Sequence, residues 1–282
     1  MKNGTKIRTK IRFALALLAA ISGFSAGPQA ALAQTKDATI AEIERYREML
    51  ADGNPAELYE VRGEELWKAK IGPKNLSLAE SCDLGIGTGV TLNAYTRMPR
   101  WFEDSKRVMD LESRVAWCRM NFQGVAEADI KKRPFGNEEN KSDMEALVAF
   151  LVGQSRGQTM NVVAGHPKEH EAYEVGKRMF YYRAGPYDFA CATCHAADDK
   201  RIRLQDLPNL TKPAGAQLAY GSWPAYRVSQ GELRTMQWRI NDCYRQQRFP
   251  EPGYLSDAVT ALNMFLAVSA NGGRYVGPGI KR

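Results

Sequence analysis

Residues 191–195 read Cys-Ala-Thr-Cys-His, and this short run constrains the chain more than any other feature. In a C-x-x-C-H run the two thiols can form thioethers with the vinyl groups of a porphyrin, and the adjacent imidazole can bind the iron. A zinc site is a weaker explanation, because the chain has no second C-x-x-C and only two other histidines, His166 and His170. The run therefore predicts a protein that folds around one covalently attached c-type haem.

The N-terminus is typical of a secretory signal peptide. An apolar run, Phe13–Ile21, follows a basic segment and precedes Ala31-Leu32-Ala33, which has the small-x-small pattern of a cleavage site. The basic residues of that segment are Lys2, Lys6, Arg8, Lys10 and Arg12. Because the apolar run is too short to span a bilayer, we expect cleavage after Ala33 and a periplasmic mature protein with no membrane segment.

Removing residues 1–33 changes the net charge of the chain. The full sequence carries 39 Lys and Arg against 32 Asp and Glu, a formal charge of +7. Residues 1–33 hold five of the basic residues and no acidic ones, so the mature chain has 34 basic and 32 acidic side chains, a charge of +2. A balance this close to neutral gives no reason to expect nucleic acid as a partner.

The two halves of the mature chain share a set of matched positions in the same order. Arg114 precedes Cys118 by four residues, just as Arg239 precedes Cys243. The other matches are Gly63 with Gly176, Gly72-Pro73 with Gly185-Pro186, Cys82 with Cys194, and Ser142-Asp143 with Ser256-Asp257. This order indicates a tandem duplication, with domains at 34–157 and 158–282 and a junction near Gly153–Val163.

The first copy lacks the residues that attach haem. Asp83 stands where the second copy has its haem-binding histidine, and no cysteine lies three residues before Cys82. Cys82 and Cys118 align with Cys194 and Cys243, which would face each other across a haem pocket. Because the first copy has no haem between them, Cys82 and Cys118 can form a disulfide. A bridge that encloses about 36 residues would stabilise the fold by roughly 3–4 kcal/mol.

Apolar periodicity predicts a mainly α fold with few strands. Ser142 and Ser256 are the predicted N-caps of two of the helices, each followed by an Asp that favours the helix dipole. The predicted helices are Ile40–Leu50, Gly63–Ala69, Ser105–Phe122, Lys141–Leu151, Lys168–Tyr182, Arg234–Arg248 and Ser256–Ala267.

The second axial ligand of the haem iron has three candidates in the sequence. Met236 and Met264 would give the ligand of an ordinary electron-carrying cytochrome, although Met264 also fits core packing in an apolar helix. Cys243 is the third candidate, because it is the one cysteine left without a partner. A thiolate is also a good ligand for haem iron, so the residue types alone leave the choice open.

Three arginines flank Cys243 in the sequence, namely Arg239, Arg245 and Arg248. Their positive charge is expected to lower the pKa of the thiol and to favour the thiolate, which is the nucleophilic form. At spacing i, i+4, Arg239 shares a helix face with Cys243 and could hold an oxyanion beside its sulfur. The alternative is a structural cysteine with arginines that only face solvent.

The cysteine-centred segment carries a family resemblance. Residues 239–248, read with the C-x-x-C-H run and the degenerate first half, resemble the SoxA family, the cytochrome subunits of the periplasmic SoxAX complex in sulfur-oxidising bacteria. Residues 77–89, 98–102 and 110–114 also resemble this family. The resemblance covers essentially the whole mature chain, and the cysteine-centred segment is its most specific part.

The resemblance implies two tandem cytochrome c-like domains, the first of which has lost its haem. Some family members carry two haems in SoxA, but Cys82-Asp83 departs from their pattern, so this chain resembles the single-haem type with a Cys82–Cys118 disulfide. The resemblance also implies a set of site residues: Cys191 and Cys194 for covalent haem, His195 and Cys243 as axial ligands, Cys243 as a catalytic persulfide, and Arg239 for substrate, with Arg245 and Arg248 less certain.

The activity that the resemblance implies is that of an L-cysteine S-thiosulfotransferase. Thiosulfate would be conjugated oxidatively to a cysteine of the carrier protein SoxYZ, with electrons passing to haem and a SoxX subunit completing a heterodimer. Two other functions remain open. A plain periplasmic electron-transfer cytochrome c would use a Met ligand, and a stand-alone thiosulfate dehydrogenase would make tetrathionate without a carrier.

Overall fold

The computed structural model describes Arg45, Met49 and residues 53–132, 134–137, 139–202 and 205–281. The predicted signal peptide, 1–33, lies outside the described residues, as does most of the predicted helix Ile40–Leu50. Helices predominate among the elements from Gly53 onward, which confirms the mainly α fold class. Among the described residues, no helix has both the length and the apolar character that crossing a membrane requires.

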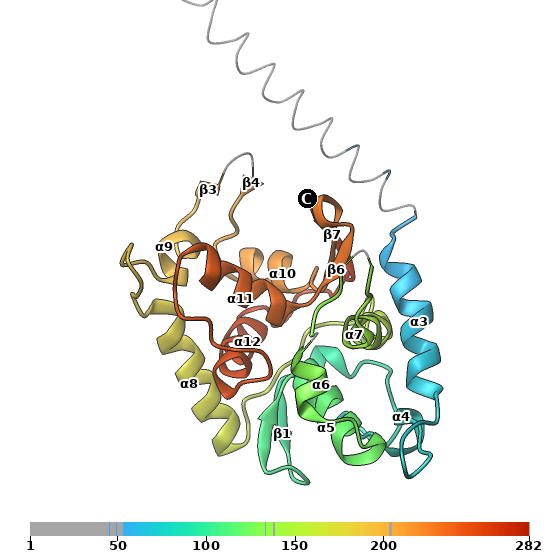
Figure 1. Ribbon diagram of the computed structural model, residues 1–282. Coiled ribbons are helices and arrows are strands. Elements are labelled where there is room, and N and C mark those ends of the chain that lie inside the picture. The colour runs from blue at the N-terminus through green and yellow to red at the C-terminus, as the bar shows by residue number, and fades with distance from the viewer. Residues whose placement is uncertain are drawn as a thin grey trace, which may run out of the picture. The chain divides into compact units, whose positions relative to one another are not determined.

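Two groups of elements follow each other along the chain (Figure 1). The first group contains α3 (Ala56–Lys68), α4 (Leu78–Ser81), the 3-10 helix η1 (Tyr95–Arg97), β1 (Arg100–Phe102), β2 (Arg107–Met109), α5 (Leu111–Gln123), α6 (Glu127–Lys132) and α7 (Asp143–Gly153). The second group contains α8 (Pro167–Tyr181), α9 (Cys191–His195), β3 (Arg201–Ile202), β4 (Gln205–Asp206), α10 (Pro213–Tyr220), β5 (Ala225–Arg227), the 3-10 helix η2 (Val228–Gln230), β6 (Glu232–Arg234), α11 (Met236–Gln246), α12 (Asp257–Ser269) and β7 (Gly279–Lys281).

The strands form three small sheets, which the sequence pattern did not predict. β1 pairs with β2 and β3 pairs with β4, both antiparallel. β5 lies between β6, to which it is antiparallel, and β7, to which it is parallel. Strands of two or three residues are too short to show an alternating apolar pattern, so their absence from the prediction has a simple physical reason.

Side-chain caps set the starts of the main helices. Ser142 accepts a hydrogen bond from the amide of Glu145, and Ser256 accepts one from the amide of Val259, which confirms both predicted N-caps. The helix predicted from Ser105 begins later, because β2 occupies residues 107–109 and Asp110 caps α5 by accepting from the amide of Ser113.

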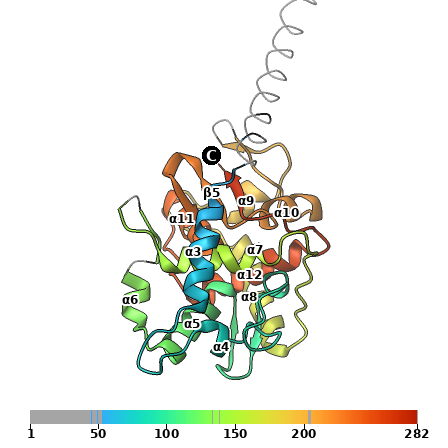
Figure 2. The same ribbon diagram turned by 90° about the vertical axis from the view of Figure 1, so that its right-hand side faces the viewer.

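A glycine lies at the crossing point of each main helix pair, α3 with α7 and α8 with α12 (Figures 1 and 2). A Cβ on Gly63 would lie 2.0 Å from the carbonyl oxygen of Ala146. A Cβ on Gly176 would lie 1.9 Å from the carbonyl oxygen of Ala261. The backbones therefore approach so closely that only a residue without a side chain fits, and the same device occurs in both groups.

Replacing either crossing glycine with alanine is expected to destabilise the fold by about 1–3 kcal/mol, because the two helices must move apart. Gly165→Ala is the control, since a Cβ there would meet its nearest neighbour, Val163 Cγ1, at an ordinary 3.5 Å. Chemical denaturation of the three variants measures the effect. Equal stability of Gly63→Ala, Gly176→Ala and the control would contradict this view of the crossings.

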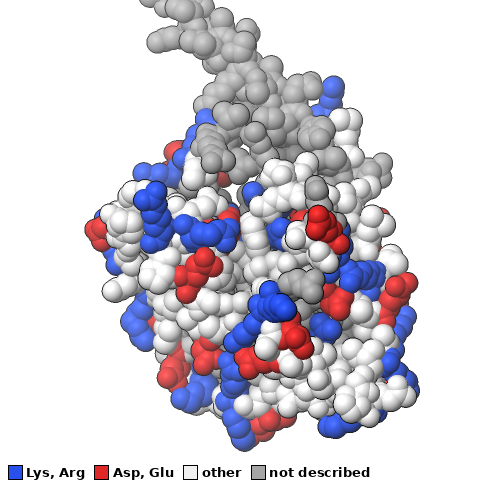
Figure 3. Space-filling model, viewed as in Figure 1, with Lys and Arg blue, Asp and Glu red and all other residues white. Residues whose placement is uncertain are grey.

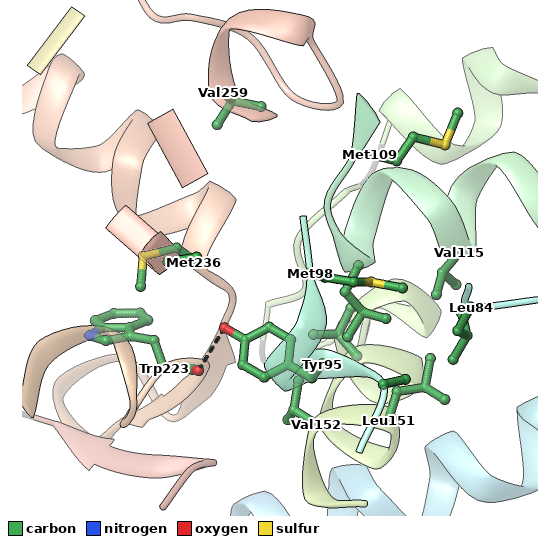
Figure 4. Packing of buried hydrophobic residues seen from close by; sticks show 14 of the residues in the cluster. Leu84, Tyr95, Met98, Met109, Val115, Leu151, Val152, Trp223, Met236 and Val259 are labelled. Atoms are coloured by element: carbon green, nitrogen blue, oxygen red, sulfur yellow. Dashed lines mark hydrogen bonds between the residues drawn. The ribbon is translucent and has the colours of Figure 1, made fainter. Parts of the chain in front are cut away.

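One hydrophobic core runs through both groups of elements. Figure 4 shows buried residues of both groups in contact, with the Tyr95 hydroxyl donating to the carbonyl oxygen of Trp223 at 3.2 Å. Buried polar side chains add to this contact: the Gln237 amide of α11 donates to Asp110 at 2.7 Å, and the Asn263 amide of α12 donates to the same carboxylate at 2.6 Å. Asp110 therefore links α5 to two helices of the second group.

Candidate haem site

Helix α9 carries all three residues of the C-x-x-C-H run. Its first turn is closed by Thr193, whose hydroxyl accepts a hydrogen bond from the amide of Ala190 at 2.9 Å. Cys191 and Cys194 are three residues apart on this helix and lie on one side of it. Both are half-buried free thiols, as attachment to a porphyrin would require of the protein before the thioethers form.

His195 is held in one orientation by the loop that follows α9. Its Nδ1 lies 2.9 Å from the carbonyl oxygen of Pro208, which leaves Nε2 as the nitrogen available to a metal. Burial lowers the pKa of His195, the bond to Pro208 partly opposes this, and the positive charge of Arg239 lowers the pKa further. The imidazole is therefore favoured in its neutral form, which is the form that binds iron.

Cys243 lies on α11 and is the third half-buried free thiol. Burial raises the pKa of Cys191, and the negative charge of a Cys243 thiolate raises it further; a Cys194 thiolate acts on Cys243 in the same way, so the three thiols lie within electrostatic range of one another. His195 belongs to the same region, because Arg239, one helical turn before Cys243, adds to the effect of burial in lowering the pKa of His195. The three free thiols and His195 thus belong to one region of the fold.

The expected lowering of the Cys243 pKa is wrong. Burial raises the pKa of this thiol, and the opposing charges of Arg239 and Arg227 do not compensate for it. Arg245 is exposed and bonded to Asp242, and Arg248 is exposed and lies over the ring of Tyr187 at 5.6 Å from its centroid. Coordination to a metal, which deprotonates a thiol outright, is a stronger source of thiolate than these arginines.

Asp242 organises the arginines beside Cys243, a role that the sequence analysis missed. This buried carboxylate accepts from Arg239 Nη1 at 3.0 Å, from Gln246 Nε2 at 2.7 Å and from Arg245 Nη2. Arg239 is therefore held one turn away from Cys243 with part of its charge neutralised. Nothing but its position beside Cys243 marks Asp242 in the sequence.

The two methionine candidates belong to the core. Met264 is fully buried in α12 and packs in the hydrophobic cluster. Met236 is also buried, at the start of α11, where it lines a small cavity together with Tyr95 and Asp110. Half-buried apolar residues of α9 and of the segments near it pack against the core: Ala192, Ala196, Leu210, whose amide donates to the carbonyl oxygen of His195 at 2.8 Å, and Tyr244, next to Cys243. Two free thiols, a neutral imidazole and apolar side chains together fit a c-type haem.

In the first group of elements the matched positions have structural roles. A disulfide joins Cys82 and Cys118, the pair expected from the sequence, and both are fully buried. Asp83 caps a turn by accepting from the amides of Gly85 at 2.6 Å and Gly87 at 2.9 Å. Arg114 is buried and bonds both carboxylate oxygens of Asp104, at 2.8 and 2.7 Å. The residue matched to Arg239 is thus fully occupied within the fold.

The remaining histidines lie at the start of α8. His166 is the N-cap of this helix, its Nδ1 accepts from the amide of Lys168 at 3.2 Å, and its ring stacks on Trp101 at 4.5 Å between centroids. His170 lies four residues further along, within the same helix. His166 therefore has a capping role that accounts for its position.

The mainly α fold and the helix that carries the C-x-x-C-H run define a protein of the cytochrome c class. A family model described as SoxA/TsdA, cytochrome c domain, matches residues 62–160. The L-cysteine S-thiosulfotransferase subunit SoxA of Hydrogenophilus thermoluteolus is 51% identical over 95% of this chain and 98% of that protein. A protein of the same name from Hydrogenobacter thermophilus is 32% identical over 97% of this chain and 99% of its own. The chain belongs to the SoxA family.

A solved structure agrees with this family membership. The crystal structure of SoxXA from P. pantotrophus matches with a TM-score of 0.69 and 26% identity, covering 84% of each chain. The fold described above is therefore similar to that of a solved member of the SoxXA group.

Proposed function

We propose that this chain is the SoxA subunit of an L-cysteine S-thiosulfotransferase, which conjugates thiosulfate to a cysteine of the carrier protein SoxYZ in the periplasm. The observation that carries the proposal is the position of Cys243: a free thiol beside the C-x-x-C-H helix, one helical turn from Arg239. The names of the relatives support the same activity. A SoxX subunit, as in the matched SoxXA structure, would complete the heterodimer.

Cys191 and Cys194 would hold one c-type haem, His195 and Cys243 would bind its iron, and the haem would supply one-electron redox chemistry. The hydrogen bond from His195 to Pro208 fixes the imidazole for this role. The nearby apolar side chains would keep water away from the haem.

The proposed reaction has two steps at Cys243, which acts as a persulfide. In the first, the terminal sulfur of the persulfide forms an S–S bond with the outer sulfur of thiosulfate, and the two electrons released pass one at a time to an oxidised cytochrome c as the final acceptor. In the second, the thiolate of the carrier attacks the sulfur that bears the sulfonate. The new S–S bond breaks, the carrier leaves with the thiosulfonate group, and Cys243 regains its persulfide. Arg239 would hold the sulfonate oxygens during both steps.

The duplication supports the same assignment. We propose that residues 34–157 form a haem-free cytochrome c-like domain and that residues 158–282 form the haem-binding one, after a signal peptide at 1–33. The equivalent glycine crossings, at Gly63 and Gly176, favour a common origin of the two groups. The Cys82–Cys118 disulfide would take the place of the haem in the first domain.

Reconstitution tests the proposed function. The complex of this chain with its SoxX subunit, incubated with thiosulfate, SoxYZ and an oxidised cytochrome c, is expected to add one thiosulfonate group to the carrier, detected by intact mass. The purified chain is expected to show one haem on the Cys191–Cys194 peptide. Thiosulfate oxidation to tetrathionate without the carrier, or an electron-transfer activity with no change in carrier mass, would contradict the proposal.

A further inference from the structure

Arg227 lies at the end of β5 with a side chain that the fold does not satisfy. Its backbone is fixed by pairing with Glu232 of β6 and Lys281 of β7. The side chain is half-buried, and within the described part of the chain its Nε is buried without a hydrogen-bond partner. Because a buried donor without a partner is unfavourable, such a group usually has a ligand that the protein alone does not supply.

The surroundings of Arg227 are those of the Cys243 site. The charges that act on it come from Arg239, Asp242, Cys243 and Arg234. The guanidinium therefore lies within electrostatic range of the reactive thiol and of the arginine that precedes it by one turn. Bringing cationic groups together in a half-buried place is unfavourable unless an anion joins them.

The other arginines of this region are already occupied. Arg239 bonds to Asp242, and so does Arg245. Arg234 bonds to Glu145 at 3.0 Å and to the carbonyl oxygen of Gly136 at 2.9 Å. Arg227 has no ion pair of this kind among the described residues, so its charge is available to a bound molecule.

We propose that Arg227 is a second substrate-binding residue, which together with Arg239 clamps the sulfonate oxygens of thiosulfate and leaves the outer sulfur free to meet Cys243. The proposal rests on the proposed function and names a residue for its substrate. A guanidinium can donate two parallel hydrogen bonds to a tetrahedral oxyanion. Since Asp242 neutralises part of the charge of Arg239, Arg227 supplies the positive charge that a dianion needs.

The surface charges agree with the view that only the arginines of the site attract the substrate anion. On the described part of the face shown in Figure 3, acidic and basic side chains are interspersed among uncharged residues. This face has no broad basic surface to attract an anion, so we expect binding to depend on the cationic groups at the site itself. The clamp would also discriminate, because a neutral or singly charged sulfur compound gains less from two guanidinium groups than a dianion does.

The test compares Arg227→Gln with Arg227→Lys in the haem-loaded complex with SoxX. Sulfate, an unreactive dianion, serves as the probe, and its binding is measured by calorimetry without the carrier. We expect Arg227→Gln to weaken sulfate binding and to raise the KM for thiosulfate, each by about tenfold or more, with a smaller change in kcat. Arg227→Lys should recover part of the loss, because it keeps the charge. The haem spectrum should be unchanged in both variants.

Arg107→Gln is the matched control, since Arg107 lies in the hairpin of the first group and pairs with Asp257. Unchanged sulfate affinity and KM in Arg227→Gln would overturn the inference. If Arg227→Gln does not fold, the same measurements on Arg227→Lys decide: values equal to those of the wild type for both sulfate and thiosulfate, despite loss of the planar donor, would also overturn it. Failure of the wild-type complex to modify the carrier would instead contradict the proposed function, while the sulfate measurement would still test the anion site.

Discussion

Replacing Cys243 with alanine is expected to reduce thiosulfate transfer to the carrier by about 10³-fold or more, while haem stays attached through Cys191 and Cys194. The attachment thiols lie on α9 and do not depend on α11 for their own chemistry. Loss of Cys243 removes the sulfur that forms and breaks the S–S bond, and removing a covalent nucleophile has effects of this size or larger. The measurement is carrier mass over time, with haem content determined in parallel.

Cys243→Met separates the two roles of this residue. A thioether is an ordinary ligand of c-type haem iron, but it cannot become a persulfide or form the S–S bond to thiosulfate. This variant should therefore be as inactive in transfer as Cys243→Ala. Substantial carrier modification by either variant would show that Cys243 is not the reacting sulfur. The plain electron-transfer cytochrome would then be the better description.

The sequence groups Cys191, Cys194 and His195 because they lie within five residues of one another, so no knowledge of the tertiary fold is needed to place them together. The fold brings Cys243, on another helix, within electrostatic range of these residues. Arg227 could not have been found in this way, because only the pairing of a three-residue strand carries it to the site.

The pKa of Cys243 could not be predicted from the sequence either. Neighbours along the chain suggested a thiol surrounded by three cations, but Asp242 takes up Arg239 and Arg245 while Arg248 lies over an aromatic ring. Burial therefore has the largest effect on the pKa of Cys243, and a count of the charges near it in the sequence does not show that it is buried. The helices with clear caps, at Ser142 and Ser256, were by contrast predicted correctly, since a cap is a local interaction.

Arg114 and Arg239 occupy matched positions in the sequence but differ in how many of their donors the fold uses. Each precedes a cysteine by four residues, but Arg114 bonds Asp104 through two nitrogens and also donates to the carbonyl oxygen of Asp83. Arg239 makes a single bond to Asp242 and is partly exposed. A guanidinium with unused donors can bind substrate, and one that is fully bonded can only stabilise the fold.

Removing the Cys82–Cys118 disulfide is expected to lower the free energy of unfolding by about 4 kcal/mol. The bridge closes a loop of 36 residues, and the lost conformational entropy of the unfolded chain gives this value. Both sulfurs are fully buried between α4 and α5, so the bridge also fills space in the core. The variant is Cys82→Ala/Cys118→Ala, since a single substitution would leave a free thiol.

Denaturant unfolding of three samples separates the two contributions: the oxidised wild type, the wild type with this disulfide reduced, and the double variant. The difference between the first two is the effect of the cross-link, while that between the last two is the effect of losing the sulfur atoms from the core. The thioethers proposed to hold haem resist reductant, so haem stays attached in all three samples. A cross-link effect below about 1 kcal/mol would mean that the core alone stabilises this part of the fold. It would also contradict the proposal that the bridge takes the structural place of a haem.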